Sequence, residues 1–217
     1  MLKFKRTRSI CCFCLVVVAM YLSMHKVTST GAEFSQNLHG HPQLEKGVLL
    51  VANRSIKDPN FSETVVLITE YNELITLGLI LNRPTQHSAS SMLPRLAKLS
   101  LDPGNIQFGG PVGLNFLQLL VGTEDRLDEQ LKVIDHVYII DSDDSLSLLL
   151  DAKMKLTGIR AYGGVSSWAT GQLEDELLHG DWYLWRADKY RIFSQRPGEM
   201  WLDLIRLVSA QYAVNHQ

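Results

Sequence analysis

Acidic and amide side chains that could take part in catalysis gather within the stretch "GGVSSWATGQLEDELLHGDWYL". Gln172, Glu174 and Asp175 lie within four positions of one another there, directly after a glycine. Paired carboxylates can hold a divalent cation or act as a general acid and a general base. With Asp58 and Arg83 as further candidate catalytic residues, this cluster predicts one alternative function, that of a metal-assisted hydrolase.

The same residues also fit a structural interpretation, which we favour. Residues 171–179 are expected to form a short helix that begins after Thr170 or Gly171 and ends at Gly180. With Gly171 as the cap, Glu174 occupies the third helical position, from which its carboxylate can reach back to the free amides. The helix dipole stabilises such a carboxylate by about 0.3–1 kcal/mol, so Glu174 needs no catalytic role.

Two predicted turns supply further candidate residues. Asn82-Arg83-Pro84 ends one predicted strand, and Gly109-Gly110-Pro111 ends another. In the functional alternative, the glycine turn and Trp168 form a cleft with the acidic helix start. Arg83 then has two possible roles, an internal salt bridge to an acid of the Glu174 cluster, which we favour, or contact with an anionic ligand.

Composition argues against several classes of function. The first 30 residues hold five of the 21 Lys and Arg residues and none of the 23 Asp and Glu residues, so the rest carries 16 basic against 23 acidic residues. Such a surface repels duplex nucleic acid, which makes a direct DNA-binding regulator the least favoured function. All three cysteines lie at positions 11–14, and the remaining sequence has no short nucleotide-binding or hydrolase motif. No cofactor is predicted.

The first 30 residues are interpreted as a signal peptide or an N-terminal membrane anchor. A basic stem precedes an apolar run over roughly residues 10–24, a length typical of a signal-peptide core. Because the basic stem stays in the cytoplasm, the domain is expected to be exported or held at the inner membrane on its outer side, with this segment contacting the membrane. If translation starts at Met20 or Met24, the protein is instead cytoplasmic. Residues 31–46 are expected to be a linker.

Hydrophobic patterning predicts a single mixed domain over residues 47–217. A helix is expected to begin at Ser142, with two acids in its first turn, and a C-terminal helix is expected to carry one apolar stripe of Trp201, Leu204, Ile205, Val208 and Tyr212. Strands are expected at 47–54, 64–71, 75–82, 105–112, 116–122, 133–141, 159–164 and 182–186. Hairpins and helices without strict βαβ repetition favour an α/β (α+β) fold with a mixed β-sheet.

At these residues the chain resembles the AlgH/YqgE family of small bacterial proteins. The ordered stretches "KGVLLVANRSIKDPNFSETVVLITEY", "LGLILNRPT", "QFGGPV" and "GGVSSWATGQLEDELLHGDWYL" carry the resemblance over roughly residues 44–210. Val165-Ser166-Ser167 stands where the family has Tyr-Ala-Gly. The matching positions are Asp58, Phe61, Asn82, Arg83, Pro84, Gly109, Gly110, Pro111, Trp168, Gly171, Gln172, Leu173, Glu174 and Trp182.

The resemblance implies a sheet or small closed barrel with flanking helices, and it implies a regulatory role without assigning catalytic residues. The leading expectation is therefore a non-catalytic regulatory or interaction protein with a protein partner. The metal-assisted hydrolase is the alternative, and the direct DNA-binding transcriptional regulator comes third.

Overall fold

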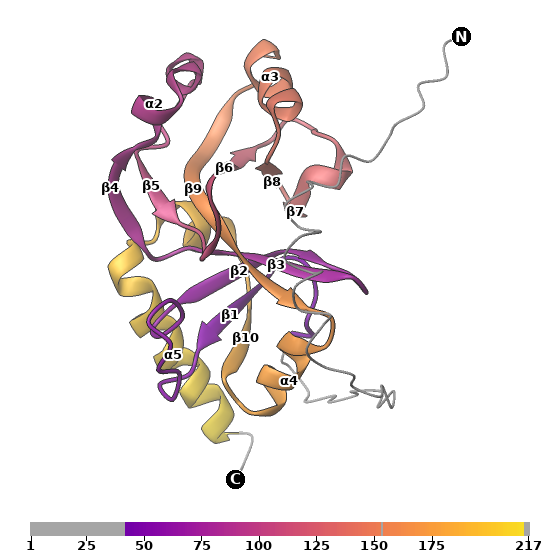
Figure 1. The fold of residues 1–217 in the computed structure, drawn as a ribbon, viewed down its shortest axis with the longest axis vertical. Helices are drawn as coiled ribbons and strands as arrows, with labels where there is room; N and C mark the ends of the chain where they lie inside the picture. The colour runs from indigo at the N-terminus through magenta and orange to yellow at the C-terminus, as the bar shows by residue number, and fades with distance from the viewer. Residues whose placement is uncertain (1–41, 153, 215–217) are drawn as a thin grey trace. The chain divides into compact units, whose positions relative to one another are not determined.

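A computed structural model describes residues 42–152 and 154–214, which belong to one compact unit. Its main sheet has the strand order β10-β1-β2-β3-β9-β6-β8-β7, and every neighbouring pair in this order is antiparallel (Figure 1). The strands are β1 Val48–Ala52, β2 Val65–Tyr71, β3 Ile75–Ile80, β4 Pro84–Ser88, β5 Asn105–Phe108, β6 Val112–Thr123, β7 Lys132–Ile134, β8 Val137–Ile140, β9 Leu156–Ala169 and β10 Trp182–Arg186. The predicted α+β class with a mixed sheet is confirmed.

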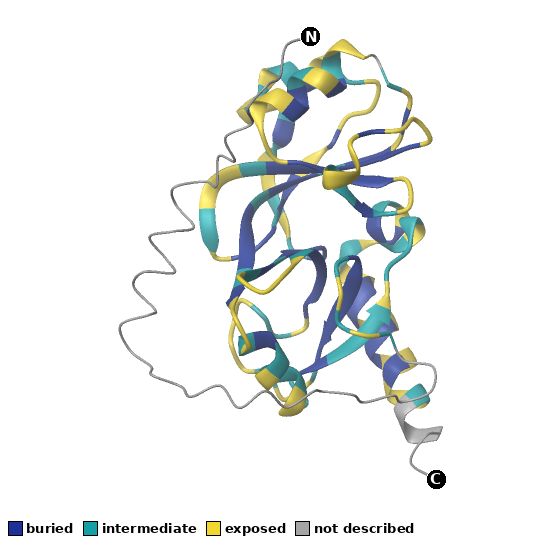
Figure 2. Ribbon diagram, turned by 90° about the vertical axis from the view of Figure 1, so that its right-hand side faces the viewer, coloured by how far each residue is buried: buried dark blue, intermediate teal, exposed yellow. Residues whose placement is uncertain are grey.

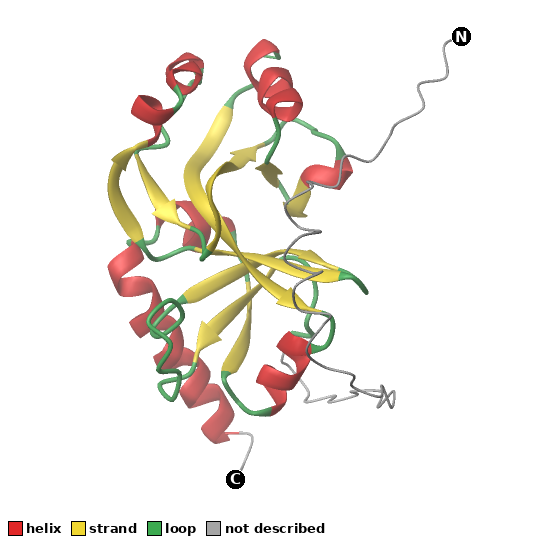
Figure 3. Cartoon of the chain, viewed as in Figure 1, coloured by secondary structure: helices red, strands yellow, loops and turns green. Residues whose placement is uncertain are grey.

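Helices flank the sheet at both of its ends (Figure 3). Near β4, β5, β6 and β8 lie the helices of the middle of the chain, and near β1, β2 and β10 lie α4 and α5. The helical elements are α2 Ala89–Met92, η1 Pro94–Lys98, η2 Glu129–Leu131, α3 Asp143–Asp151, α4 Gln172–Leu178, η3 Tyr190–Ser194 and α5 Pro197–Val214.

The 14-residue strand β9 joins the two halves of the sheet. Its residues from Leu156 to Val165 pair with β6, and its end pairs with β3. Tyr162 and Gly163 also pair in parallel with β5. The sequence-based expectation that Gly163-Gly164 ends this strand is wrong. Gly164 has φ 76°, and without a side chain it passes close to Gly110 O and Val112 O, so the strand continues past it to Ala169.

Two apolar clusters form the buried core (Figure 2), and β6, β8 and β9 contribute residues to both of them. The larger one surrounds β1, which is buried along its whole length, as a strand covered on both faces should be. α5 packs on it with the predicted stripe of Trp201, Leu204, Ile205 and Val208, while the side chain of Tyr212 lies outside the described part. Trp201 Nε1 donates to Ala52 O at 2.8 Å, which ties this helix to the end of β1.

The smaller cluster lies under α2, η1 and α3, on β6, β8 and β9. α3 begins as predicted, because Ser142 and Ser145 form a capping box and two aspartates occupy the first turn. The single strand expected at 133–141 is wrong. A turn at Asp135-His136, where His136 has φ 61°, divides it into β7 and β8.

Candidate functional site

The glycine turn that follows β5 packs directly on the backbone of β9. Gly109 N–H donates to Gly163 O at 2.9 Å, and Gly109 O accepts from Ile80 N–H at 2.9 Å and from Ser166 Oγ at 3.2 Å. A Cβ on Gly110, which has φ 152°, would overlap the backbone of Ser166. The absence of side chains on the two glycines therefore lets the backbone of this turn pack directly against the backbone of β9.

Asn82 fixes the connection that leads into β2. Its Oδ1 accepts from Val65 N–H at 2.9 Å, and its Nδ2 donates to Glu63 O at 2.9 Å. Glu63 has φ 55°, an uncommon conformation for a residue with a side chain, and the bond to its carbonyl holds it there. Because Asn82 is only 8% exposed and uses both polar atoms in this way, its role is to hold the backbone.

Asp58 and Arg83 stabilise the turn that precedes β2. Asp58 Oδ1 accepts from Asn60 N–H at 2.7 Å, and Arg83 Nη2 donates to Ser62 O. The favoured prediction of a salt bridge between Arg83 and the Glu174 cluster is wrong, because the ion pairs of the described residues do not include Arg83. Its guanidinium group contacts a backbone carbonyl instead.

Glu174 contacts the far end of β2. Its Oε1 accepts from the Tyr71 hydroxyl at 2.8 Å. Burial, followed by the hydrogen bond to Glu174 and its charge, raises the pKa of Tyr71 to about 12. The predicted bond from Glu174 to the helix start is not formed. Gly171 is the N-cap residue of α4, with φ 79°. The side-chain bond at the helix start comes instead from Gln172, whose Oε1 accepts from Ala169 N–H at 3.1 Å.

The candidate catalytic residues are therefore spread along β2 and α4. Asp58 lies in the turn before β2 and Arg83 contacts that turn, whereas Glu174 contacts the last residue of β2, and seven strand residues span about 20 Å. Asp175 is exposed on α4. Among the described residues, no group of three or more His, Cys, Asp or Glu side chains is arranged to hold a metal ion.

Glu176, rather than Glu174, occupies the centre of this region. Its Oε2 accepts from Trp168 Nε1 at 2.9 Å and from Trp182 Nε1 at 2.8 Å, and its Oε1 accepts from Gln172 Nε2 at 3.0 Å. Trp168 belongs to β9 and Trp182 to β10, so one carboxylate joins α4 to two strands. We call Glu176, Gln172, Trp168 and Trp182 the indole latch.

Aromatic packing completes the indole latch. The rings of Trp168 and Trp182 meet edge to face with centroids 6.3 Å apart, and Phe61 lies 6.1 and 6.0 Å from them. Both indoles are nearly buried, at 2% and 5% exposure. Buried indole N–H groups require an acceptor, and an acid on the helix between the two tryptophans is the nearest candidate in sequence. This rule could have identified Glu176, which the sequence analysis did not single out.

The chain is similar to a family of known proteins over most of its length. The family model described as AlgH-like matches residues 49–213. The chain belongs to the AlgH-like family. A relative from Nocardia farcinica, named UPF0301 protein, is 33% identical over 77% of this chain and 79% of its own length.

Two solved structures share the fold. The solution structure of the AlgH protein from Pseudomonas aeruginosa has a TM-score of 0.59 at 27% identity and covers 75% of this chain and 87% of that one. A crystal structure of a Corynebacterium diphtheriae protein has a TM-score of 0.67 at 22% identity over 76% and 88% of the two chains, which shows likeness of fold alone.

The predictions of a signal peptide or membrane anchor, and of an exported or inner-membrane location, are contradicted. In residues 42–152 and 154–214 no helix has the length and apolar character needed to cross a membrane. The apolar run on which these predictions rested lies outside the described residues and outside the region that matches the AlgH-like family.

The AlgH-like domain also has a surface feature that the sequence analysis missed. Two neighbouring hollows of about 270 and 170 Å³ share Phe116 and Leu117 as lining residues. We call them together the Phe116 groove. Its apolar lining includes Leu93, Met92, Ile106, Leu114, Leu119, Ile140 and Leu146. Thr85, Gln107, Phe108 and Gly163, which lie in the stretches that carry the family resemblance, line the smaller hollow.

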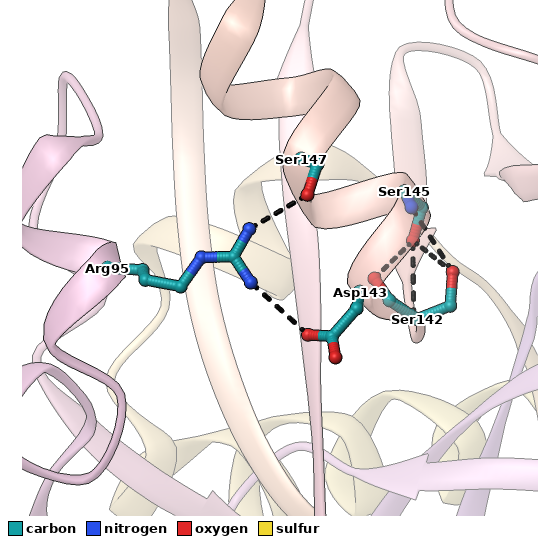
Figure 4. Close-up of polar contacts among 5 residues, drawn as sticks. All are labelled: Arg95, Ser142, Asp143, Ser145 and Ser147. Carbon is teal, nitrogen blue, oxygen red and sulfur yellow. Dashed lines mark hydrogen bonds and ion pairs between the residues drawn. The ribbon is translucent and has the colours of Figure 1, made fainter.

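One side of the larger hollow is held in place by Arg95 (Figure 4). Arg95, on η1, donates from Nη2 to Ser147 Oγ at 2.8 Å and forms an ion pair from Nη1 to Asp143 Oδ1 at 3.3 Å, both on α3. Leu93 next to η1 and Leu146 on α3 both line this hollow. Arg95 therefore sets the spacing between two walls of the groove.

Asp141 adds a negative charge at the mouth of the larger hollow, where it follows β8. Desolvation raises the pKa of its carboxyl group, while its own backbone amide and the charge of Lys46 act in the opposite sense. Within the described part of the chain Asp141 forms no ion pair at 4 Å or less. The residue as a whole is exposed, so this shift corresponds to little energy.

Proposed function

We propose that the protein acts by binding a partner rather than by catalysing a reaction. One observation carries this proposal: except for the exposed Asp175, the candidate polar side chains of the region that resembles an active site bond to other side chains or to backbone. Glu176 accepts three hydrogen bonds within the indole latch, and Asn82 uses both polar atoms on backbone groups. A catalytic group must instead lie within reach of a substrate.

The metal-assisted hydrolase receives little support from this arrangement. Its proposed residues lie at opposite ends of β2, and Asp58 and Arg83 already stabilise a turn. A direct DNA-binding function is disfavoured by the excess of acidic residues after residue 30. The Phe116 groove, by contrast, offers exposed apolar surface of the kind that interaction sites use.

Purified full-length protein tests the proposal when it is incubated with carboxylic esters, phosphoesters and nucleotides, with and without Mg²⁺ or Mn²⁺. We expect hydrolysis at the background rate in every case. The proposal would be overturned by turnover that is lost in Glu174→Gln at an unchanged melting temperature. The control Glu199→Gln on α5 should retain that turnover.

A further inference from the structure

The Phe116 groove exists because β6 leaves its partner strand near its start. Val112 pairs with Val165 and Leu117 pairs with Gly163, so four residues of β6 stand opposite a single residue of β9. Bulges of this kind redirect side chains and are frequent next to functional sites. Here the bulge places Leu114 and Phe116 on the surface, 60% and 40% exposed.

Charge and size limit what can occupy this groove. Six apolar side chains line the larger hollow together with Ser142 and two exposed acids, Asp141 and Asp143. Arg95 pairs with Asp143, whereas Asp141 has no ion-pair partner among the described residues. Phosphates, nucleotides and fatty-acid carboxylates would meet these acids unfavourably, while lysine or arginine would be attracted.

The two hollows hold separate side chains better than one small molecule. Pockets for small molecules usually enclose about 300–1,000 Å³, and each hollow, at about 270 and 170 Å³, is smaller than that. Phe116 and Leu117 line both hollows, so the two are neighbours. Two neighbouring hollows of this size match two apolar side chains of one peptide segment.

We propose that the Phe116 groove binds a segment of another polypeptide that carries two apolar anchor side chains and an adjacent lysine or arginine. The apolar anchors fill the two hollows, and the basic residue pairs with Asp141. This inference rests on the proposed binding function and names the chemistry of the partner. It assigns the interaction to the part of the domain that holds the smaller apolar cluster, whereas the tryptophans of the indole latch belong to the larger one.

Selection from a random peptide library on the immobilised full-length protein tests this proposal. We expect enriched peptides that combine two apolar residues with lysine or arginine. Phe116→Asp should weaken their binding at least about tenfold, as loss of an interface anchor does. Leu178→Asp, on α4, is the matched control, because Leu178 is also exposed, at 59%, and should leave binding unchanged.

Charge reversal tests the second part. Asp141→Lys should weaken binding about tenfold at low salt and less at high salt, because ions screen the pairing. Asp175→Lys, at an exposed acid on α4, should have little effect. Circular dichroism spectra that match the wild type confirm that each variant is folded.

Several outcomes would overturn the proposal. These are the absence of enriched peptides, the enrichment of acidic peptides, and binding that Phe116→Asp leaves intact. Phe116-dependent self-association in sedimentation, or Phe116-dependent binding to anionic lipid vesicles without peptide binding, would assign the groove to another occupant. None of these results would produce catalytic turnover, so failure here is distinguishable from failure of the proposed function.

Discussion

Removing the carboxylate of Glu176 should destabilise the domain more than removing any other acid of α4. In Glu176→Ala, the indole N–H groups of Trp168 and Trp182 lose their shared acceptor, and Gln172 loses a partner. Both tryptophans are at most 5% exposed, so water reaches their N–H groups poorly.

The expected loss follows from these contacts. A buried donor left without an acceptor costs about 1–3 kcal/mol, so two indoles together cost about 2–6 kcal/mol. Because Glu176 is only half-buried, water can partly replace its carboxylate as the acceptor. The expected loss of unfolding free energy therefore lies in the lower part of that range. For a domain of this size, 1 kcal/mol changes Tm by about 2–4 °C, which gives a decrease of at least about 4 °C.

Thermal and urea unfolding, followed by circular dichroism and tryptophan fluorescence, measure this loss. Glu174→Ala is the matched control, because it removes an acid two positions away whose hydrogen bond to Tyr71 is exposed and should cost under about 1 kcal/mol. Glu176→Gln keeps an acceptor oxygen and should fall between the two. A Glu176→Ala variant as stable as the wild type, or less affected than Glu174→Ala, would refute this reasoning.

Three further predictions concern backbone contacts and ionisation. Gly110→Ala should lower Tm in thermal unfolding far more than Gly171→Ala. The new Cβ at position 110 would overlap backbone, whereas a Cβ at position 171 meets open space and adds only about 1–2 kcal/mol of left-handed strain. Equal decreases in Tm would contradict this. Because the pKa of Tyr71 is raised from 10.0 to about 12, its contribution to stability is complete below pH 10 and is lost as the pH rises through 12. Urea unfolding from pH 9 to 12 should therefore show a shallower decline in Tyr71→Phe than in the wild type, and parallel curves would argue against it. Since desolvation raises the pKa of Asp141, ionisation of its carboxyl group opposes folding. Asp141→Asn should therefore raise Tm slightly at pH 7, and this gain should disappear below pH 3.8, the ordinary pKa of the group. A gain in Tm that persists in acid would have another cause.

Local patterns in the sequence predicted the elements that depend on local chemistry. The hairpin of β2 and β3, the Ser142 cap and the buried stripe of α5 all follow from spacing within a few residues. The fold class also followed, because alternation and apolar runs report which faces are buried.

Features that depend on long-range contacts could not be predicted in this way. Gly164 usually signals the end of a strand, but here it lets β9 pass the glycine turn after β5, more than fifty positions earlier in the chain. Glu174 has the sequence position of a helix-capping acid, yet Gln172 makes the local bond and Glu174 reaches Tyr71. The partner of Arg83, a backbone carbonyl, carries no sequence signal at all.

Binding rather than catalysis requires that Glu176 and its tryptophans bond to one another and not to a ligand. Hydrogen exchange of the indole N–H groups, followed by NMR on the full-length protein, measures whether they do. The N–H groups of Trp168 and Trp182 should exchange far more slowly than that of the half-buried Trp185, and should keep their chemical shifts when Mg²⁺, Mn²⁺ or phosphate is added. Rapid exchange at Trp168 and Trp182, or shifts that saturate with one of these ions, would contradict the account.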